Sequence, residues 1–156
     1  MNRFNEWPGR PPRLHVVFNP TPLYFVTFCT YAHQRILASH LVMESFKDAA
    51  RKISRAGNAI GRFVIMPDHV HTFLRVGPIG RLGLAVKCLK ESITKRLRIG
   101  QPDLTVWQAG FFDHLLRRSE SYAAKWEYVR RNPVRAGLVS EPDLWPYQGE
   151  IEPIPW

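Results

Sequence analysis

Two histidines separated by one residue are the first feature of the sequence that could support chemistry. His69 and His71 flank Val70 within a run of mostly apolar residues, a pattern typical of a β-strand. Successive side chains of a strand point to opposite faces, so the two imidazoles project side by side while Val70 faces the core. Adjacent imidazoles form a platform for a divalent metal ion. The spacing alone leaves open an alternative, a pair of surface histidines without a metal.

A tyrosine and an asparagine are spaced so that they could reach a common site. Tyr128 and Asn132 lie four residues apart near the end of a predicted helix, which places them on the same helix face. A phenol nucleophile and an amide oxygen ligand could therefore act together. The alternative is a core aromatic residue, with Asn132 only ending the helix before Pro133.

These two pairs predict a specific chemistry if the fold brings them together. Two imidazole nitrogens and an amide oxygen would leave positions on the metal for a phosphate oxygen and water. The metal would polarise a scissile phosphate and stabilise the leaving oxygen. A tyrosine could then attack in line and form a covalent phosphotyrosine. Imidazole ligands suit Mn²⁺ better than Mg²⁺, but these ligands leave the identity of the metal open.

The predicted elements that must position these residues follow one another in a recognisable order. We expect strands over 23–30, 59–66 and 69–76, a helix over 41–53, a long helix carrying Leu82 to Leu97, a strand and bend around 107–112, and a helix over 119–131. This order predicts a split βαβ, ferredoxin-like α+β fold. It has an antiparallel sheet with helices on one face and an additional C-terminal helix that carries the tyrosine. Residues 1–21 are expected to form a basic, Pro-rich arm, 22–147 the domain and 148–156 a tail.

The charge balance indicates a polyanionic partner. Lys and Arg number 22 against 13 acidic residues, a formal net charge of +9. A positive field speeds encounter with phosphate backbones. Candidate phosphate contacts on the long helix and near the tyrosine helix are Lys87, Lys90, Arg117, Arg118, Arg130, Arg131 and Arg135. For each of them singly, the alternative is a solvated surface charge.

Other classes of protein find little support in the sequence. Cys29 and Cys88 are too few for a disulfide framework or a cysteine-rich zinc site, so we expect reduced thiols and a cytoplasmic location. We see no apolar run of the length of a membrane span and therefore expect no membrane partner.

Two segments resemble a known family. The segment MPDHVHTFLRV (66–76) resembles the histidine-pair motif of the HUH-type single-tyrosine transposases. The segment 106–139 is similar to the C-terminal half of their REP-associated tyrosine transposase branch, and NPVRAGLV (132–139) is its most specific part. The resemblance covers roughly 12–147. It implies a ferredoxin-like fold, a divalent metal, and breakage and joining of single-stranded DNA near hairpins.

Carried over by position, the resemblance assigns individual roles. It makes His69 and His71 metal ligands, Tyr128 the nucleophile, and Asn132 a third ligand where some relatives have Gln. The choice of Tyr128 among five tyrosines rests on this resemblance. The implied partner is single-stranded DNA with hairpins, bound by a monomer or a homodimer. Two alternatives remain: a non-catalytic protein that binds DNA or RNA hairpins, and a small metal hydrolase that uses activated water.

Overall fold

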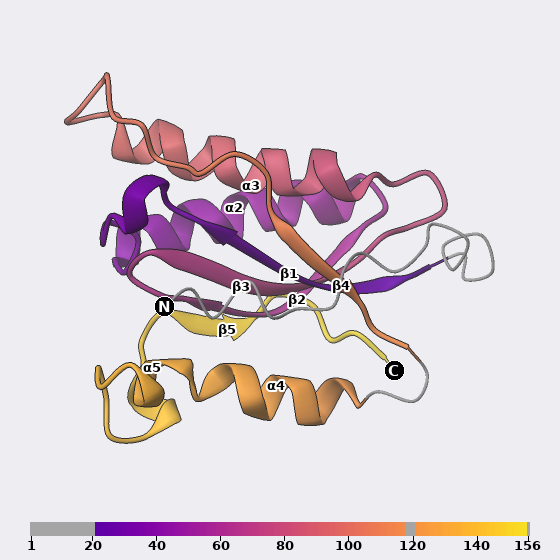
Figure 1. Ribbon diagram of the computed structural model, residues 1–156. Helices are drawn as coiled ribbons and strands as arrows, with labels where there is room; N and C mark the ends of the chain where they lie inside the picture. Colours follow the sequence, from indigo (N-terminus) through magenta and orange to yellow (C-terminus); the bar gives the residue numbers. More distant parts are fainter. Residues whose placement is uncertain (1–20, 118–120, 156) are drawn as a thin grey trace.

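A five-stranded antiparallel sheet forms the centre of the molecule (Figure 1). The computed structural model describes residues 21–117 and 121–155. The strands lie in the order β4-β1-β3-β2-β5, and every neighbouring pair is antiparallel. Their bounds are β1 Leu23–Cys29, β2 Ala59–Ile65, β3 His69–Arg75, β4 Phe112–Leu115 and β5 Gln148–Glu150.

Helices cover both faces of this sheet (Figure 1). On one face lie α2 (His40–Arg55) and α3 (Leu82–Leu97), which pack against each other. On the other lie α4 (Tyr122–Arg130) and the short α5 (Asn132–Arg135). The turns η2 (Tyr31–His33) and η3 (Pro142–Leu144) are 3-10 helices. Among the described residues, no helix has both the length and the apolar character needed to cross a bilayer.

The alternation of side chains along the strands divides the apolar core into two layers. On β1, Val26 and Phe28 pack toward α2 and α3, whereas Leu23 and Phe25 pack toward α4. Because both faces are covered, all seven residues of β1 are buried, and all but Thr27 are apolar or aromatic. On β3, Val70 faces the α2 and α3 layer, so its neighbours His69 and His71 face the side of α4.

Helix α4 is held tightly against the sheet. Ser121 caps it, its hydroxyl accepting a hydrogen bond from the backbone N–H of Ala124 at 3.1 Å. The hydroxyl of Tyr122 accepts a hydrogen bond from the backbone N–H of Arg62 at 3.2 Å. A Cβ atom on Gly61 would lie only 2.6 Å from that hydroxyl oxygen, so this close approach depends on glycine.

The predicted ferredoxin-like fold is confirmed, with two differences in detail. The sequence placed a strand and bend around 107–112, but β4 begins at Phe112, and Trp107 makes only an isolated bridge with Thr30. The reason is that the indole N–H of Trp107 donates to α3, to the carbonyl of Lys90 and the hydroxyl of Thr94. The expected helix over 119–131 is observed as α4, Tyr122–Arg130. The first two residues of the expected helix, 119–120, lie outside the described residues.

The second difference concerns the expected tail over 148–156. Residues 148–150 form β5, which pairs with the outer edge of β2 and extends the sheet. The indole N–H of Trp145 donates to the carbonyl of Ile65 at 3.0 Å, and Ile154 is buried beside Gly61. An open strand edge carries unpaired backbone groups, so the segment following α5 satisfies groups that β2 would otherwise expose.

Candidate active site

A cavity of about 840 Å³ lies between the sheet and the helices α4 and α5. The four residues that the sequence predicted to carry the chemistry all line this cavity: His69, His71, Tyr128 and Asn132. Arg135, predicted as a phosphate contact, lines it as well. The other polar side chains of its wall are Thr27, His33, Asp68, Asp113, His114 and Lys125.

The two histidines point their Nε2 atoms toward each other. These two atoms lie 3.1 Å apart, and the rings meet nearly edge to face. The remaining nitrogen of each ring is engaged elsewhere. His69 Nδ1 lies 2.7 Å from a carboxylate oxygen of Asp68, and His71 Nδ1 lies 2.7 Å from the hydroxyl of Thr27. Such outer hydrogen bonds fix the orientation of metal-binding imidazoles.

This arrangement fits a divalent cation. Two imidazole nitrogens bound to one ion at about 2.1 Å each, at an angle somewhat above 90°, lie roughly 3 Å apart. Within the described residues, no group of three or more His, Cys, Asp or Glu side chains is arranged to hold a metal. A third protein ligand would therefore have to be of another kind, and the amide of Asn132 lines the same cavity.

Electrostatics favour the ligand forms of these groups. Burial, aided by the charges of His69, Arg135 and Lys125, holds the pKa of His71 well below its ordinary value of 6.5. The imidazole is therefore neutral near pH 7, the form that binds a metal. The hydrogen bond with His69 lowers the pKa of Asp68 despite its partial burial, so this carboxylate stays ionised. The carboxylate holds the ring of His69 in place through its Nδ1 atom.

Tyr128 and Asn132 form the opposite wall of the cavity. The side chain of Tyr128 is 61% exposed, which excludes the alternative of a core aromatic residue. Arg135 connects the two residues through its guanidinium group. One nitrogen, Nη2, donates to the backbone carbonyl of Tyr128 at 2.8 Å and to Oδ1 of Asn132 at 2.5 Å. The guanidinium carbon lies 4.2 Å from the centre of the Tyr128 ring, a cation–π contact.

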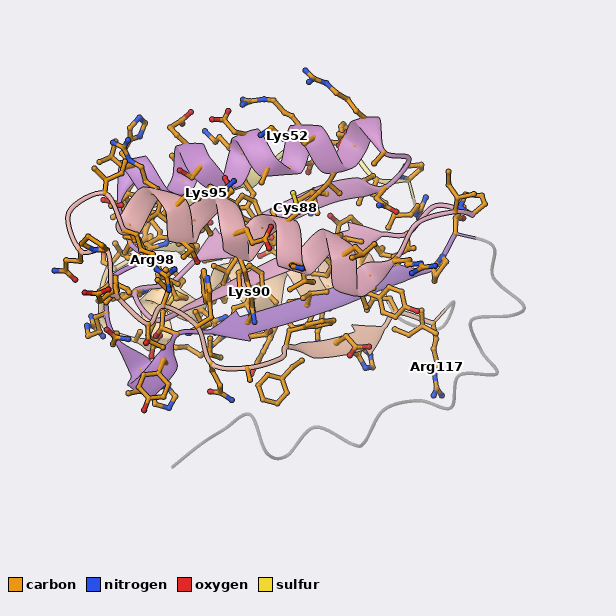
Figure 2. The ribbon with its side chains drawn as sticks, turned by 90° about the horizontal axis from the view of Figure 1, so that it is seen from above. Lys52, Cys88, Lys90, Lys95, Arg98 and Arg117 are labelled. Atoms are coloured by element: carbon orange, nitrogen blue, oxygen red, sulfur yellow. The ribbon has the colours of Figure 1, made fainter. Side chains whose placement is uncertain are left out.

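The predicted phosphate contacts are distributed over both faces of the sheet. Lys87 and Lys90 belong to α3, on the face opposite to α4, and the structure does not bring them to the cavity. Figure 2 looks onto their face and shows Lys90, Lys95 and Arg98 along α3 and its end. Lys87 pairs with Glu91 at 3.7 Å, whereas the ammonium of Lys90 donates to the carbonyls of Gln108 and Gly110. Lys90 therefore has a structural role in holding the segment before β4.

Among the remaining predicted arginines, Arg130 and Arg131 lie at the end of the tyrosine helix. Arg130 pairs with Glu127 at 3.0 Å and with Asp143 at 2.6 Å, so its charge is largely compensated. Arg131 is exposed, and Arg117 is exposed just after β4 (Figure 2). Arg118 lies outside the described residues.

Several cavity residues were missed by sequence reasoning. Lys125 lies three residues before Tyr128 on α4, and this helical spacing could have predicted it. Asp68 immediately precedes His69, and carboxylates commonly orient metal-binding histidines. Thr27 gives no local signal, because only the pairing of β1 with β3 places it opposite His71. His114 also lines the cavity.

The fold and the cavity define a ferredoxin-like domain with a histidine pair facing a helical tyrosine. Residues 21–132 match the family described as Transposase IS200 like, which is most of the chain. The chain therefore belongs to the IS200-like transposase family, as the resemblance of its two motifs predicted.

The chain is also similar to individual proteins. The chain is 26% identical over 88 residues to the REP-associated tyrosine transposase of Escherichia coli K12, a match that covers 56% of this chain and 52% of that protein. It thus spans about half the length of that relative. It is 22% identical over 153 residues to an uncharacterised Haemophilus influenzae protein, covering 77% of this chain and 84% of that one.

A solved structure shares the fold. The structure of a REP-associated tyrosine transposase bound to a REP hairpin superposes with a TM-score of 0.66 at 20% identity. The match covers 81% of this chain and 75% of the solved chain. At this level of identity the likeness shows the fold.

Proposed function

We propose that this protein is a metal-dependent transposase that cleaves and rejoins single-stranded DNA near hairpins through a 5′-phosphotyrosine intermediate. One observation carries the proposal. The Nε2 atoms of His69 and His71 converge to 3.1 Å in a cavity whose opposite wall carries the exposed Tyr128. Membership of the transposase family and similarity to REP-associated relatives support the choice of hairpin DNA.

In this proposal, His69, His71 and Asn132 hold a Mg²⁺ or Mn²⁺ ion. The ion would supply Lewis-acid polarisation of the scissile phosphate. Thr27 and Asp68 orient the two imidazoles through their Nδ1 atoms. The cationic side chains of Lys125 and Arg135 in the same cavity attract the phosphate backbone.

Tyr128 is the nucleophile of the proposed reaction. Its hydroxyl oxygen bonds to phosphorus while the bond from phosphorus to the 3′ oxygen breaks. The phenol loses its proton, the departing 3′ oxygen gains one, and the 5′ end stays attached to the protein. Attack on the phosphotyrosine by a 3′-hydroxyl of another DNA end reverses these changes and joins the strands. The exposure of Tyr128 allows a DNA phosphate to approach its hydroxyl.

The central test is Tyr128→Phe, offered a labelled hairpin oligonucleotide with Mg²⁺ or Mn²⁺. We expect the variant to form no SDS-stable protein–DNA adduct and to lose cleavage at least 10³-fold, because it lacks the attacking oxygen. Tyr31→Phe is a matched control, since Tyr31 is also exposed, at 56%, but does not line the cavity. Undiminished cleavage by Tyr128→Phe would overturn the assignment.

Two other functions predict different results in the same assay. A non-catalytic protein that binds DNA or RNA hairpins would bind equally well with EDTA, and the unaltered protein would give no adduct. A metal hydrolase using activated water would keep its activity in Tyr128→Phe and lose it in His69→Ala. The proposed transposase loses cleavage in both variants.

A further inference from the structure

The side chain of Arg135 contacts the two residues, Tyr128 and Asn132, that the proposed chemistry needs. Its Nη2 atom donates to Oδ1 of Asn132, the proposed third metal ligand, at 2.5 Å. The same atom donates to the backbone carbonyl of Tyr128, and the guanidinium stacks on the phenol ring at 4.2 Å. We call this set of contacts the arginine clamp. Arg135 is exposed and lines the cavity, so an incoming DNA strand can reach its guanidinium group.

The arginine clamp opposes a metal ion on two counts. An amide oxygen has two lone pairs, but a guanidinium and a divalent cation that share one oxygen repel each other at short range. The guanidinium also adds a positive charge close to the histidine pair, and this charge contributes to the lowered pKa of His71. Binding of a metal by Asn132 therefore requires Arg135 to move away or to be neutralised.

A DNA phosphate can do both. Guanidinium groups bind phosphate oxygens through paired hydrogen bonds that are stronger than a bond to a neutral amide. A phosphate entering the cavity thus competes for Arg135 and compensates its charge. Once Arg135 has turned to the phosphate, Oδ1 of Asn132 is free to face the histidine pair.

We propose that Arg135 couples the binding of DNA to the binding of metal, by masking Asn132 in the DNA-free protein and releasing it when a phosphate binds. Arg135 is then a positioning residue as well as a phosphate contact. The benefit is that the complete metal site forms only with DNA in place. This inference rests on the proposed function, because it takes Asn132 and the histidine pair as the metal ligands.

The test measures Mn²⁺ binding to the DNA-free protein, by the electron paramagnetic resonance signal of the free ion. Arg135→Ala removes the mask and the charge together, so we expect Mn²⁺ to bind about 5- to 50-fold more tightly, within the range usual for coupled sites. Arg55→Ala is the matched control, since Arg55 is exposed at the end of α2, on the other face of the sheet, and does not line the cavity. It is expected to leave Mn²⁺ affinity unchanged.

Two further variants separate masking from simple charge repulsion. Arg135→Lys keeps the charge, but its side chain ends one bond short of the position of Nη2 and so reaches Oδ1 of Asn132 less well; masking therefore predicts tighter Mn²⁺ binding in this variant too. In an Asn132→Ala background, masking predicts that Arg135→Ala gains less affinity than it does with Asn132 present. An Arg135→Lys variant that binds Mn²⁺ like the unaltered protein would overturn the masking of Asn132.

The coupling has a second, reciprocal readout. An uncleavable hairpin, offered to Tyr128→Phe, should tighten Mn²⁺ binding, and Arg135→Ala in that background should reduce this tightening at least 5-fold. If Arg135→Ala binds Mn²⁺ no more tightly than the unaltered protein and unfolds at the same temperature, the coupling by Arg135 is overturned while the proposed function still stands. If His69→Ala binds Mn²⁺ as well as the unaltered protein does, the proposed metal site itself fails.

Discussion

At the scale of single residues, His71 shows how the fold prepares a neutral ligand. The imidazole is only 6% exposed, stacks against Phe25, and has the hydroxyl of Thr27 at one nitrogen and His69 at the other. Burial lowers its pKa, so it keeps a lone pair for a cation at neutral pH. The hydrogen bond with Thr27 fixes the plane of the ring, which sets the direction of Nε2.

Removal of that hydrogen bond should weaken the metal site. Thr27→Val keeps the shape of the side chain but removes the hydroxyl that orients His71, so Mn²⁺ affinity is expected to fall about 10- to 100-fold. Thr72→Val is a suitable control. Thr72 is also buried on a central strand, but its hydroxyl donates to the carbonyl of Arg62 and it does not line the cavity. Equal Mn²⁺ affinities of the two variants, measured by calorimetry, would contradict the role of Thr27.

The lowered pKa of His71 also predicts how stability depends on pH. Below pH 6.5 the imidazole of the unfolded chain takes up a proton, whereas the buried imidazole does not until the pH is well below that. Falling pH therefore stabilises the unfolded state, and the free energy of unfolding should drop between pH 7 and 5 with a slope approaching ~1.4 kcal/mol per pH unit. Urea denaturation in EDTA measures this slope.

His71→Gln provides the comparison for that measurement. The variant lacks the titrating imidazole, so its stability should vary less over the same pH range. The lowered pKa of Asp68 acts with the same sign, but only below its ordinary value of 3.8, outside this range. Identical slopes for the two proteins would exclude His71 as the cause.

At the scale of elements, the position of α4 depends on contacts at its first turn. Tyr122 packs edge to face against Phe73 and reaches the backbone of β2 over Gly61. The guanidinium of Arg62 lies over the rings of Tyr122 and Trp126 and pairs with Glu150 of β5. Thus β2, α4 and β5 hold one another, and Tyr128 depends on them for its position beside the histidines.

A methyl group at position 61 should disturb this contact. In Gly61→Ala the Cβ atom would lie 2.6 Å from the Tyr122 hydroxyl oxygen and 2.7 Å from Cδ1 of Ile154, so α4 and the C-terminal segment must shift. We expect a loss of about 1–3 kcal/mol of stability, and adduct formation that falls more than hairpin affinity. Gly83→Ala is the control, because nothing lies within 4 Å of its Cβ and a helical alanine should add about 0.5–1 kcal/mol. Urea denaturation of both variants checks the prediction, and unchanged stability of Gly61→Ala would contradict it.

At the scale of the whole molecule, the positive charge is divided between the two faces of the sheet. The cavity face carries Lys125 and Arg135, whereas Lys87 and Lys90 belong to the α3 face. A short strand that fills only the cavity cannot contact both faces. The size of the DNA therefore determines which cations take part in binding.

This division predicts different effects for two lysine substitutions. For a single strand short enough to occupy the cavity alone, Lys125→Gln should lower affinity and reduce the salt slope by about one, whereas Lys87→Gln should change neither. Fluorescence anisotropy over a range of salt concentrations measures both quantities. The same measurement with a complete hairpin tests the predicted phosphate contact of Lys87. If Lys87 contacts the hairpin, Lys87→Gln reduces the salt slope for the hairpin but not for the short strand. Equal effects of the two variants on the short strand would contradict the division.

Local patterns in the sequence determined much of the fold and half of the site. The two-residue period of a strand places His69 and His71 on one face, and the spacing of Tyr128 and Asn132 places them along one wall. The order of apolar patterns predicted the ferredoxin-like arrangement of β1 to α3. These features depend on residues that are near one another in the chain, so the periodicity of the sequence is enough to predict them.

Other features were decided only by the tertiary structure. The antiparallel register of β1 and β3 sets Thr27 opposite His71, and the packing of α4 and α5 on the sheet brings Tyr128 and Asn132 into one cavity with the histidines. The packing of α3 against α2 removes Lys87 and Lys90 from the cavity, and pairing with β2 turns residues 148–150 into a strand. Each of these contacts joins segments whose local sequence is compatible with several partners. Only the folded sheet, which must bury both faces and pair its edges, selects among them.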